Sequence, residues 1–212
     1  MQRVEDAAEP LEPVGRREQN KIDTRRAIAE AALTLARTKG AGSFTVDQIA
    51  ARAGVSRRTF FNYFHSAEEA LNVSTESFLE LAISSFSRRP AGEPLLDAMI
   101  AALAATAKVQ DLAVHGELFR MAAGSPELLR AQLHAWERAE ARIIEAVTHH
   151  LQGGASPLYV SALVGSVLSC AKAAMHDWAA DDPDRHGDAG AALEERMVLA
   201  LSMLRDGFAH PA

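Results

Sequence analysis

Residues 44–65, FTVDQIAARAGVSRRTFFNYFH, read as two short helices joined by a tight turn at Gly54. Gly54 stands where the first helix must stop and the chain must reverse, a position that favours a residue tolerating positive φ. The second helix opens with Arg57 and Arg58 on a polar face. A helix-turn-helix presents side chains to the major groove of DNA in this way, so the stretch predicts a DNA-reading unit.

Both helices carry their own start signals. Thr45 is placed to cap the first helix and Gln48 to complete a capping box, while Ser56 is placed to cap the second helix. Apolar residues flank both caps at the spacing of a hydrophobic staple: Phe44 with Ile49, and Val55 with Phe60. The alternative, an ordinary helical hairpin with solvated arginines, explains this coincidence of signals less well.

The pattern divides the motif into two sides. The apolar side is predicted to hold Ile49, Val55, Phe60, Phe61 and Phe64. On the open side, the best candidates for base edges are Arg57, Arg58 and Thr59, and an arginine paired with guanine contributes about 1–3 kcal/mol of discrimination. The candidates for phosphate contacts are Thr24, Thr45, Gln48, Asn62, Tyr63 and His65, with Val46 and Ser56 completing the predicted DNA-binding set. For Tyr63 the alternative is a core aromatic with its hydroxyl at the edge.

Length and composition indicate an all-α protein in two parts. The 212 residues are rich in alanine and leucine, and no strand-like alternation stands out. We see no apolar stretch long enough to cross a membrane and no signal peptide in the charged N-terminus. Cys170 is the single cysteine, so no internal disulfide or cysteine zinc site can form, which suits a cytoplasmic location.

Charge is distributed unevenly along the chain, whose formal net charge is −6. Residues 15–65 carry ten basic and four acidic side chains, a net charge of +6. Residues 66–212 carry eleven basic and twenty acidic side chains, a net charge of −9. A basic head on an acidic body orients the molecule toward phosphate and keeps the body away from it.

We expect three regions. Residues 1–20 are predicted to be a disordered arm, residues 21–81 the DNA-binding domain with the start of a connecting helix, and residues 82–212 a helical ligand-binding and dimerisation domain. The first helix is expected to begin at Asp23 or Thr24, and an unbroken fourth helix to run over 66–88, capped by Ser66 with Glu69 in a second capping box. Longer helices are expected at 94–109, 112–123, 126–151, 157–179 and 190–208, about nine helices in all.

The run TVDQIAARAGVSRRTFFNYFHSAEEAL resembles the TetR/AcrR family of bacterial transcriptional regulators. The likeness is strong over residues 24–71 and extends to the rest in layout and length. This resemblance implies a homodimer whose heads bind a palindromic operator in double-stranded DNA. It also implies that a small effector binds the bodies and releases the protein from the operator, and that the protein is usually a repressor. One departure is Ala67, where the family often has a phosphate-contacting lysine.

The body is less specifically similar to a subgroup with an acyl-CoA-like ligand-binding domain, through residues 124–130, Trp136 with Glu140, and residues 158–178. A hydrophobic or acyl-CoA-like effector is therefore expected, with Arg120, Arg130 and Lys172 as cations at the pocket mouth. The candidate pocket residues are His115, Phe119, Met121, His134, Trp136, Cys170, Met175 and Trp178. For each of them plain core packing is the alternative.

Two helices carry a pattern suited to dimerisation. Small residues on the helix over 157–179 allow close helix approach, and large apolar residues on the last helix recur every three or four positions. The predicted interface residues are Ala162, Gly165, Ser169, Leu193, Met197, Leu201, Leu204 and Phe208. A monomer that packs these faces internally is the alternative.

The chain lacks the usual signs of an enzyme. No glutamate is followed three residues later by histidine, and there is no HExxH, P-loop or G-x-S-x-G motif, so we expect no catalytic site, metal or cofactor. A DNA-binding regulator that answers to a partner protein, or an architectural one, stays open as an alternative. In the ligand-responsive case, the segment over 66–88 is expected to link effector binding in the body to the spacing of the two heads.

Overall fold

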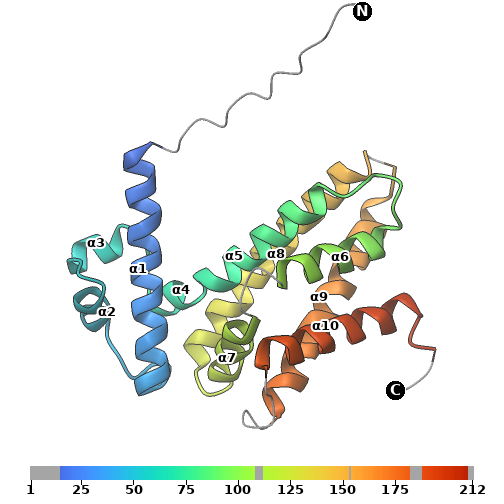
Figure 1. The fold of residues 1–212 in the computed structure, drawn as a ribbon. Coiled ribbons are helices and arrows are strands. Elements are labelled where there is room, and N and C mark those ends of the chain that lie inside the picture. Colours follow the sequence, from blue (N-terminus) through green and yellow to red (C-terminus); the bar gives the residue numbers. More distant parts are fainter. Residues whose placement is uncertain (1–14, 108–111, 153, 182–187, 210–212) are drawn as a thin grey trace, which may run out of the picture.

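The computed structural model describes residues 15–107, 112–152, 154–181 and 188–209, and in these parts the chain is helical without strands. A small head of α1 to α4 lies beside a larger body of α5 to α10 (Figure 1). The elements are α1 Arg16–Lys39, α2 Val46–Arg52, α3 Arg57–Phe61, α4 Ala67–Leu71, α5 Val73–Ser87, α6 Leu95–Ala107, α7 Leu112–Ala122, α8 Pro126–His150, α9 Pro157–Ala180 and α10 Ala189–Arg205. The predicted all-α, two-part fold is confirmed.

The local signals of the helix-turn-helix are confirmed. The Thr45 hydroxyl accepts a hydrogen bond from the Gln48 amide, and the Gln48 side chain accepts one from the Thr45 amide, which completes the capping box. Gly54 has φ +69°, with the Val55 amide donating to Ala50 O at 2.9 Å. This is a Schellman ending, so α2 stops and the chain reverses at the residue best suited to left-handed backbone.

The core of the head is closed by the body. Ile28, Ile49 and Phe60 form its centre, and no part of these side chains is exposed. Leu118 and Ala122 of α7 are part of the same buried cluster, as is Leu128 at the start of α8. The α7–α8 corner therefore completes the hydrophobic core of the DNA-reading unit.

The connecting helix is interrupted, which corrects the expectation of one unbroken segment. It divides at Asn72 into α4 and α5, and the Asn72 side chain turns back to donate to Glu68 O at 3.1 Å. Asparagine bonds local backbone groups readily, which competes with regular helix. The capping box also differs: Ser66 caps α4 as predicted, but the Glu69 carboxylate accepts from the His65 amide at 2.6 Å.

The start of the chain also differs from expectation. α1 begins at Arg16, so part of the predicted arm is helical, while residues 1–14 lie outside the described residues. Thr24 is consequently internal to the helix, and its hydroxyl donates to Asn20 O at 2.7 Å. Threonine is a frequent cap, which is why the sequence favoured a start near Thr24; in the structure α1 begins about two turns before it.

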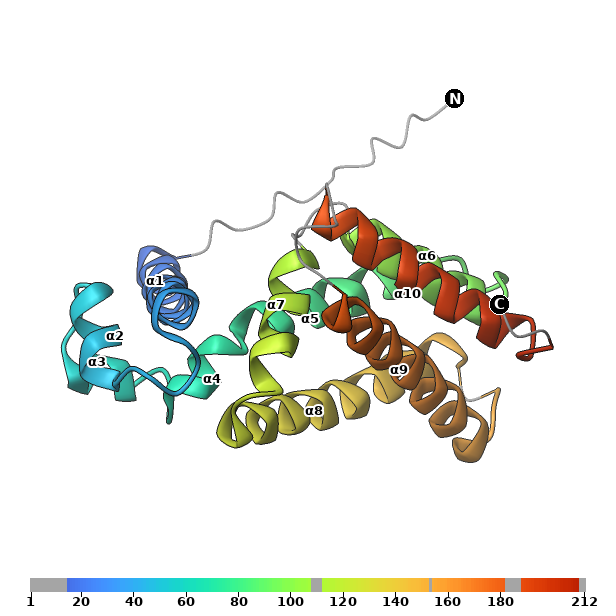
Figure 2. The same ribbon diagram turned by 90° about the horizontal axis from the view of Figure 1, so that it is seen from below.

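The body is a bundle in which α9 and α10 pack side by side (Figure 2). α5 packs on α6 and α8, and the common core contains Phe78, Trp136 and Met197. By length and composition α9 is apolar enough to span a membrane, contrary to our sequence analysis. In this fold its apolar side chains pack in part against α7, α8 and α10, as in the core helix of a bundle.

Candidate nucleic-acid interface and effector cavity

The recognition helix α3 presents both arginines at its exposed N-terminal end. Arg57 forms an ion pair with Asp47 of α2 at 2.8 Å and lies over the Phe61 ring at 5.3 Å, while Arg58 is exposed beside it. An exposed ion pair contributes only about 0–1 kcal/mol. Asp47 can therefore orient Arg57 and still release it to a base edge at small cost.

Several predicted DNA contacts also serve the fold. The Ser56 and Thr59 hydroxyls lie 2.8 Å apart, and Ser56 accepts from the Thr59 amide at 3.0 Å. Thr45 and Gln48 are exposed but hold each other in the capping box. Loss of any of these side chains changes helix capping together with any DNA contact, since a lost cap costs about 1 kcal/mol.

The remaining candidates are spread around this face. Asn62 and His65 are exposed, whereas Val46, Thr24 and Tyr63 are half-buried. Val46 and Tyr63 pack against the head core, so Tyr63 combines a core position with an accessible edge. Phe61 is exposed and lies beside the Arg57 guanidinium, which corrects the assignment of Phe61 to the apolar side. Phe60 of the short helix α3 and Phe64 just after it are the buried aromatic residues here.

Arg25 of α1 is a positioning residue that the sequence pattern did not reveal. Its guanidinium donates to Tyr63 O at 3.3 Å and to Glu76 at 3.2 Å, and lies over the Phe64 ring at 4.6 Å. Glu76 of α5 also accepts from Arg138 of α8 at 2.6 Å. One carboxylate thus links the head to two helices of the body.

A second ion pair joins the head to α7. Arg37 of α1 makes bidentate contacts with Glu117: its Nη2 donates to Oε2 at 2.6 Å and its Nε donates to Oε1 at 3.0 Å. Bidentate arginine–carboxylate pairs fix orientation as well as contributing energy. With the shared core at the α7–α8 corner, this pair sets how the head is seated on the body.

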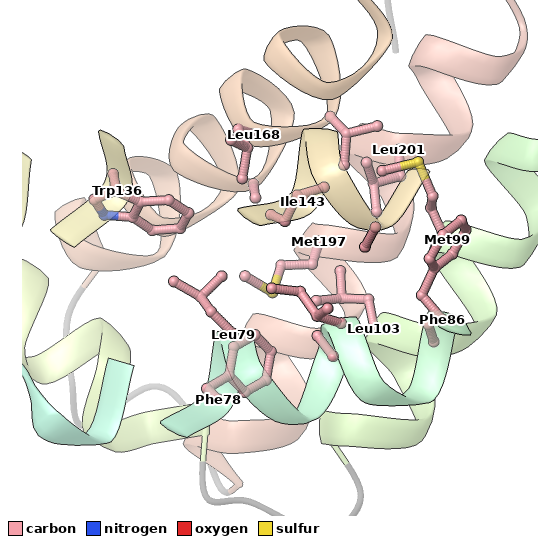
Figure 3. A pocket seen from close by; sticks show the side chains of 16 residues that line it. Phe78, Leu79, Phe86, Met99, Leu103, Trp136, Ile143, Leu168, Met197 and Leu201 are labelled. Atoms are coloured by element: carbon pink, nitrogen blue, oxygen red, sulfur yellow. The ribbon is translucent and has the colours of Figure 1, made fainter. Parts of the chain in front are cut away.

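The body encloses an apolar cavity between α5, α6, α8, α9 and α10 (Figure 3). The centre of a water-sized sphere can reach about 80 Å³ of this cavity, which also opens to solvent at its mouth. The lining residues are Phe78, Leu79, Ala82, Ile83, Phe86, Met99, Ala102, Leu103, Trp136, Ile143, Ala146, Val167, Leu168, Ala171, Met197 and Leu201. Since all of them are apolar or aromatic, the cavity suits a hydrocarbon group and offers almost nothing to a polar one.

Most predicted ligand residues lie elsewhere. Trp136 lines the cavity, and Phe119 and Trp136 line a groove on the outside of the bundle. Met121 packs against the head core, and His134 is exposed beside Glu137. Three other candidates, His115, Cys170 and Met175, are buried and do not line the cavity. A face of a helix cannot be assigned to a cavity or to solid core from its spacing alone.

Trp178 is a packing residue rather than a cavity residue. Its side chain is 3% exposed, and its indole nitrogen donates to Ala189 O at 3.1 Å. The Arg120 guanidinium covers the ring at 4.6 Å, and Gly116 of α7 lies directly against it. Gly116 was missed in the sequence because a glycine inside a helical pattern does not reveal what approaches it.

The predicted dimer residues fall into two groups. Leu193, Met197 and Leu201 are fully buried within the protomer, which corrects their assignment to the dimer interface, and Met197 and Leu201 line the cavity. The others remain accessible: Ala162, Ser169 and Phe208 are exposed, and Gly165 and Leu204 are half-buried. The regularly spaced apolar residues Leu193, Met197 and Leu201 therefore lie on the side of α10 that packs against the other helices of its own protomer.

Comparison with known protein families bears on both parts of the chain. The family "Bacterial regulatory proteins, tetR family" matches residues 28–72, and the family "MftR C-terminal domain" matches residues 93–209. The chain belongs to the TetR family. The matched segments cover the head from residue 28 onward and the body from α6 to α10, and α5 lies between them. The chain is therefore a TetR-family transcriptional regulator with a DNA-binding helix-turn-helix.

A curated relative supports the TetR assignment. The transcriptional regulator TcmR of Streptomyces glaucescens is 32% identical over 141 residues, which are 63% of this chain and 62% of TcmR. The match thus spans less than two thirds of that relative.

Solved TetR-family structures share the fold. FadR of Thermus thermophilus, a TetR-family repressor determined with lauroyl-CoA, is 24% identical with a TM-score of 0.58, covering 89% of this chain and 96% of that one. A TetR-family regulator from Syntrophomonas wolfei is 22% identical with a TM-score of 0.62, covering 91% of this chain and all of the other. At these identities the likeness concerns the fold.

Proposed function

We propose that this TetR-family protein is an effector-responsive repressor, released from a roughly palindromic operator when a small hydrophobic or acyl-CoA-like molecule binds its body. The observation that carries this proposal is the all-apolar cavity walled by α5, the helix that continues from the head. We further propose that it acts as a homodimer in the cytoplasm, as is typical of its family.

The chemistry of the cavity supports an effector with a hydrocarbon part. Phe78 and Leu79 of α5 face Met197 of α10 across it, and Met99 and Leu103 of α6 close one side (Figure 3). Burial of apolar ligand surface contributes about 25 cal/mol per Å². Methionine side chains adapt to irregular shapes, so an alkyl chain is a suitable occupant.

Contacts between head and body support a coupling route. α5 lines the cavity and its Glu76 binds Arg25 of the head and Arg138 of α8. A tail that pushes α5 outward would disturb this link and the seating of α1. An effector shifts the equilibrium between two head positions only by its difference in affinity for them.

On DNA, Arg57 and Arg58 are proposed to read base edges while Thr45, Gln48, Asn62 and other polar residues of the head position phosphates. The exposed position of both arginines at the start of α3 supports this role. In a two-fold dimer the two α3 helices would enter successive major grooves, about 34–36 Å apart or a multiple of that.

For the dimer interface we propose the outer side of α9 and α10, in place of the buried side favoured by the sequence. Leu158 of α9 is 80% exposed and Leu199 of α10 is 53% exposed, and the small residues Ala162 and Ser169 of α9 are exposed as well. Exposed large apolar residues beside small ones allow two helix pairs to approach closely and bury a joint surface.

The proposal is tested by measuring operator affinity with and without lauroyl-CoA. The operator is first selected from random duplexes with the full-length protein, and its affinity is then followed by fluorescence anisotropy at fixed salt. We expect lauroyl-CoA to weaken operator binding at least about fivefold, the lower end of typical coupling between sites. The variant Ala82→Phe, which places a ring in the cavity, should bind operator normally and respond less to the ligand.

One result would count against the proposal, and a second would reveal only a folding defect in the variant. Unchanged operator affinity with lauroyl-CoA and other long-chain probes would favour the alternative of a regulator without a small-molecule effector. Loss of the response in Ala82→Phe together with loss of operator binding would indicate misfolding; Ala82→Val, a smaller change at the same lining position, then tests the cavity without that defect.

A further inference from the structure

Phe61 of the recognition helix α3 exposes an aromatic ring on the surface that carries Arg57 and Arg58. It is 42% exposed, whereas Phe60 before it and Phe64 after it are completely buried. Among the described residues of the helix-turn-helix, Phe61 is the one large apolar side chain that is exposed. The head core therefore leaves part of this ring available for contact with a partner.

The exposed ring is held in place from two sides. Phe60 meets it edge to face, with the ring centroids 5.4 Å apart and an interplanar angle of 87°. The Arg57 guanidinium lies over it at 5.3 Å and pairs with Asp47 at 2.8 Å. Because Arg57 and Phe61 are four residues apart, they share one face of the helix. This face thus offers a fixed apolar surface directly beside a cation.

The major groove offers such a ring a single apolar partner. All base edges there carry hydrogen-bond donors or acceptors, and thymine alone adds an apolar group, its C5-methyl. Phenylalanine is one of the side chains that contact this methyl group. Against any other base edge, the ring would cover polar atoms without bonding them, which is unfavourable. The chemistry of Phe61 therefore selects thymine.

Arg57 indicates where that thymine lies. An arginine pairs best with O6 and N7 of guanine. Two base-pair steps span about 7 Å along the duplex. The Arg57 guanidinium and the Phe61 ring are 5.3 Å apart, so they address neighbouring base pairs. The ion pair with Asp47 is exposed, and the guanidinium can leave it for guanine while staying over the ring.

We infer that Phe61 determines operator specificity: its ring contacts the C5-methyl group of a thymine in the base pair next to the guanine that Arg57 reads. Each operator half-site then contains a thymine and a guanine in neighbouring base pairs. The inference rests on the proposed function, since it takes Arg57 as a base-reading residue.

Removal of single groups from the selected operator tests this. Deoxyuridine in place of thymine removes only the methyl group, and 7-deazaguanine in place of guanine removes only the N7 acceptor. Each thymine and each guanine of the half-site is replaced in turn, and the affinity of the full-length protein is measured by fluorescence anisotropy at fixed salt. We expect one deoxyuridine position to weaken wild-type binding about fourfold, the effect of one buried methyl group.

Two variants identify the side chains responsible, and a third is the control. Phe61→Ala should bind the thymine and the deoxyuridine operator equally, because the methyl group has lost its partner. Arg57→Ala should lose the response to 7-deazaguanine at one guanine, in the base pair next to that thymine. Asn62→Ala changes the next exposed residue and should keep the fourfold response. A purely structural role of Phe61 would lower the affinity for both operators by the same factor.

The outcomes separate this inference from the function on which it rests. If no thymine responds to loss of its methyl group, if Phe61→Ala responds like wild type, or if the responding thymine is not next to the guanine of Arg57, the role of Phe61 is overturned. An Arg57-dependent guanine would still support base reading. If the wild type binds every duplex equally, both fail. Circular dichroism identifies a folding defect in Phe61→Ala, and Phe61→Gln then repeats the loss of the ring with a longer side chain.

Discussion

Gly116→Ala provides the sharpest test of how the body is packed. A Cβ at this position would lie 2.3 and 2.4 Å from two atoms of the Trp178 ring, whereas ordinary contact requires at least 3.4 Å. The ring or α7 must therefore move by about 1 Å. The ring cannot turn away easily, because its nitrogen is bonded to Ala189 O and Arg120 covers its face.

The magnitude follows from two opposed effects. Overpacking a core lowers the free energy of unfolding by about 1–3 kcal/mol, whereas replacing a helical glycine with alanine raises it by up to about 1 kcal/mol. We expect Gly116→Ala to lower the free energy of unfolding by about 1–2 kcal/mol. For a chain of this size, that lowers the Tm by about 2–8 °C, measurable by circular dichroism and by urea unfolding.

Gly165→Ala is the matched control, since it is also a helical glycine. Its Cβ would meet only Glu140 Oε1 at 3.8 Å, so unfolding stability should stay the same or rise. In a Trp178→Phe background, which removes the ring atoms in the way, the cost of Gly116→Ala should shrink. Equal costs in the two backgrounds would refute the packing argument.

Three further predictions concern the head, the coupling and the thiol. Arg57→Ala and Arg58→Ala should each weaken binding to the selected operator by about 1–3 kcal/mol in anisotropy titrations, while Arg130→Ala in the body should not; equal affinity for a scrambled duplex would contradict the base-reading role. Glu76→Gln should bring the ratio of the operator affinities measured without and with lauroyl-CoA toward one. The free energy of unfolding should fall by less than about 1 kcal/mol, because the ion pairs of Glu76 with Arg25 and Arg138 are partly exposed. An unchanged ratio would exclude Glu76 as a link between effector and head. Burial raises the pKa of the Cys170 thiol, so alkylation at pH 8 should be at least about tenfold slower in the folded than in the urea-unfolded protein, and equal rates would contradict its burial.

The head could be predicted from the sequence because its signals are local. Thr45, Gln48 and Ser56 cap helices within three residues of themselves, and Gly54 ends a helix by its own backbone preference. Such signals do not depend on distant parts of the chain. Arg25 was missed because its partners lie 38 and 51 residues away.

The body was predictable in helix positions but not in helix orientation. Met197 and Leu201 recur at the spacing of an interface, and the same spacing serves a helix that packs inside its own protomer. Trp178 illustrates the same limit, since only the fold brings Gly116 beneath it. The interruption at Asn72 was hidden because a single asparagine is tolerated within many helices.

The α7–α8 corner in the head core has a consequence for recombining regulators of this kind. A chimera that joined residues 15–72 to the body of another TetR-family protein would replace Leu118, Ala122 and Leu128 in the shared cluster with that body's own residues. To exchange operator specificity between two such regulators, one would therefore graft only the exposed residues of α2 and α3, or transfer the α7–α8 corner together with the head. A substitution at any of these three positions acts on both halves of the protein, because the two halves share that interior.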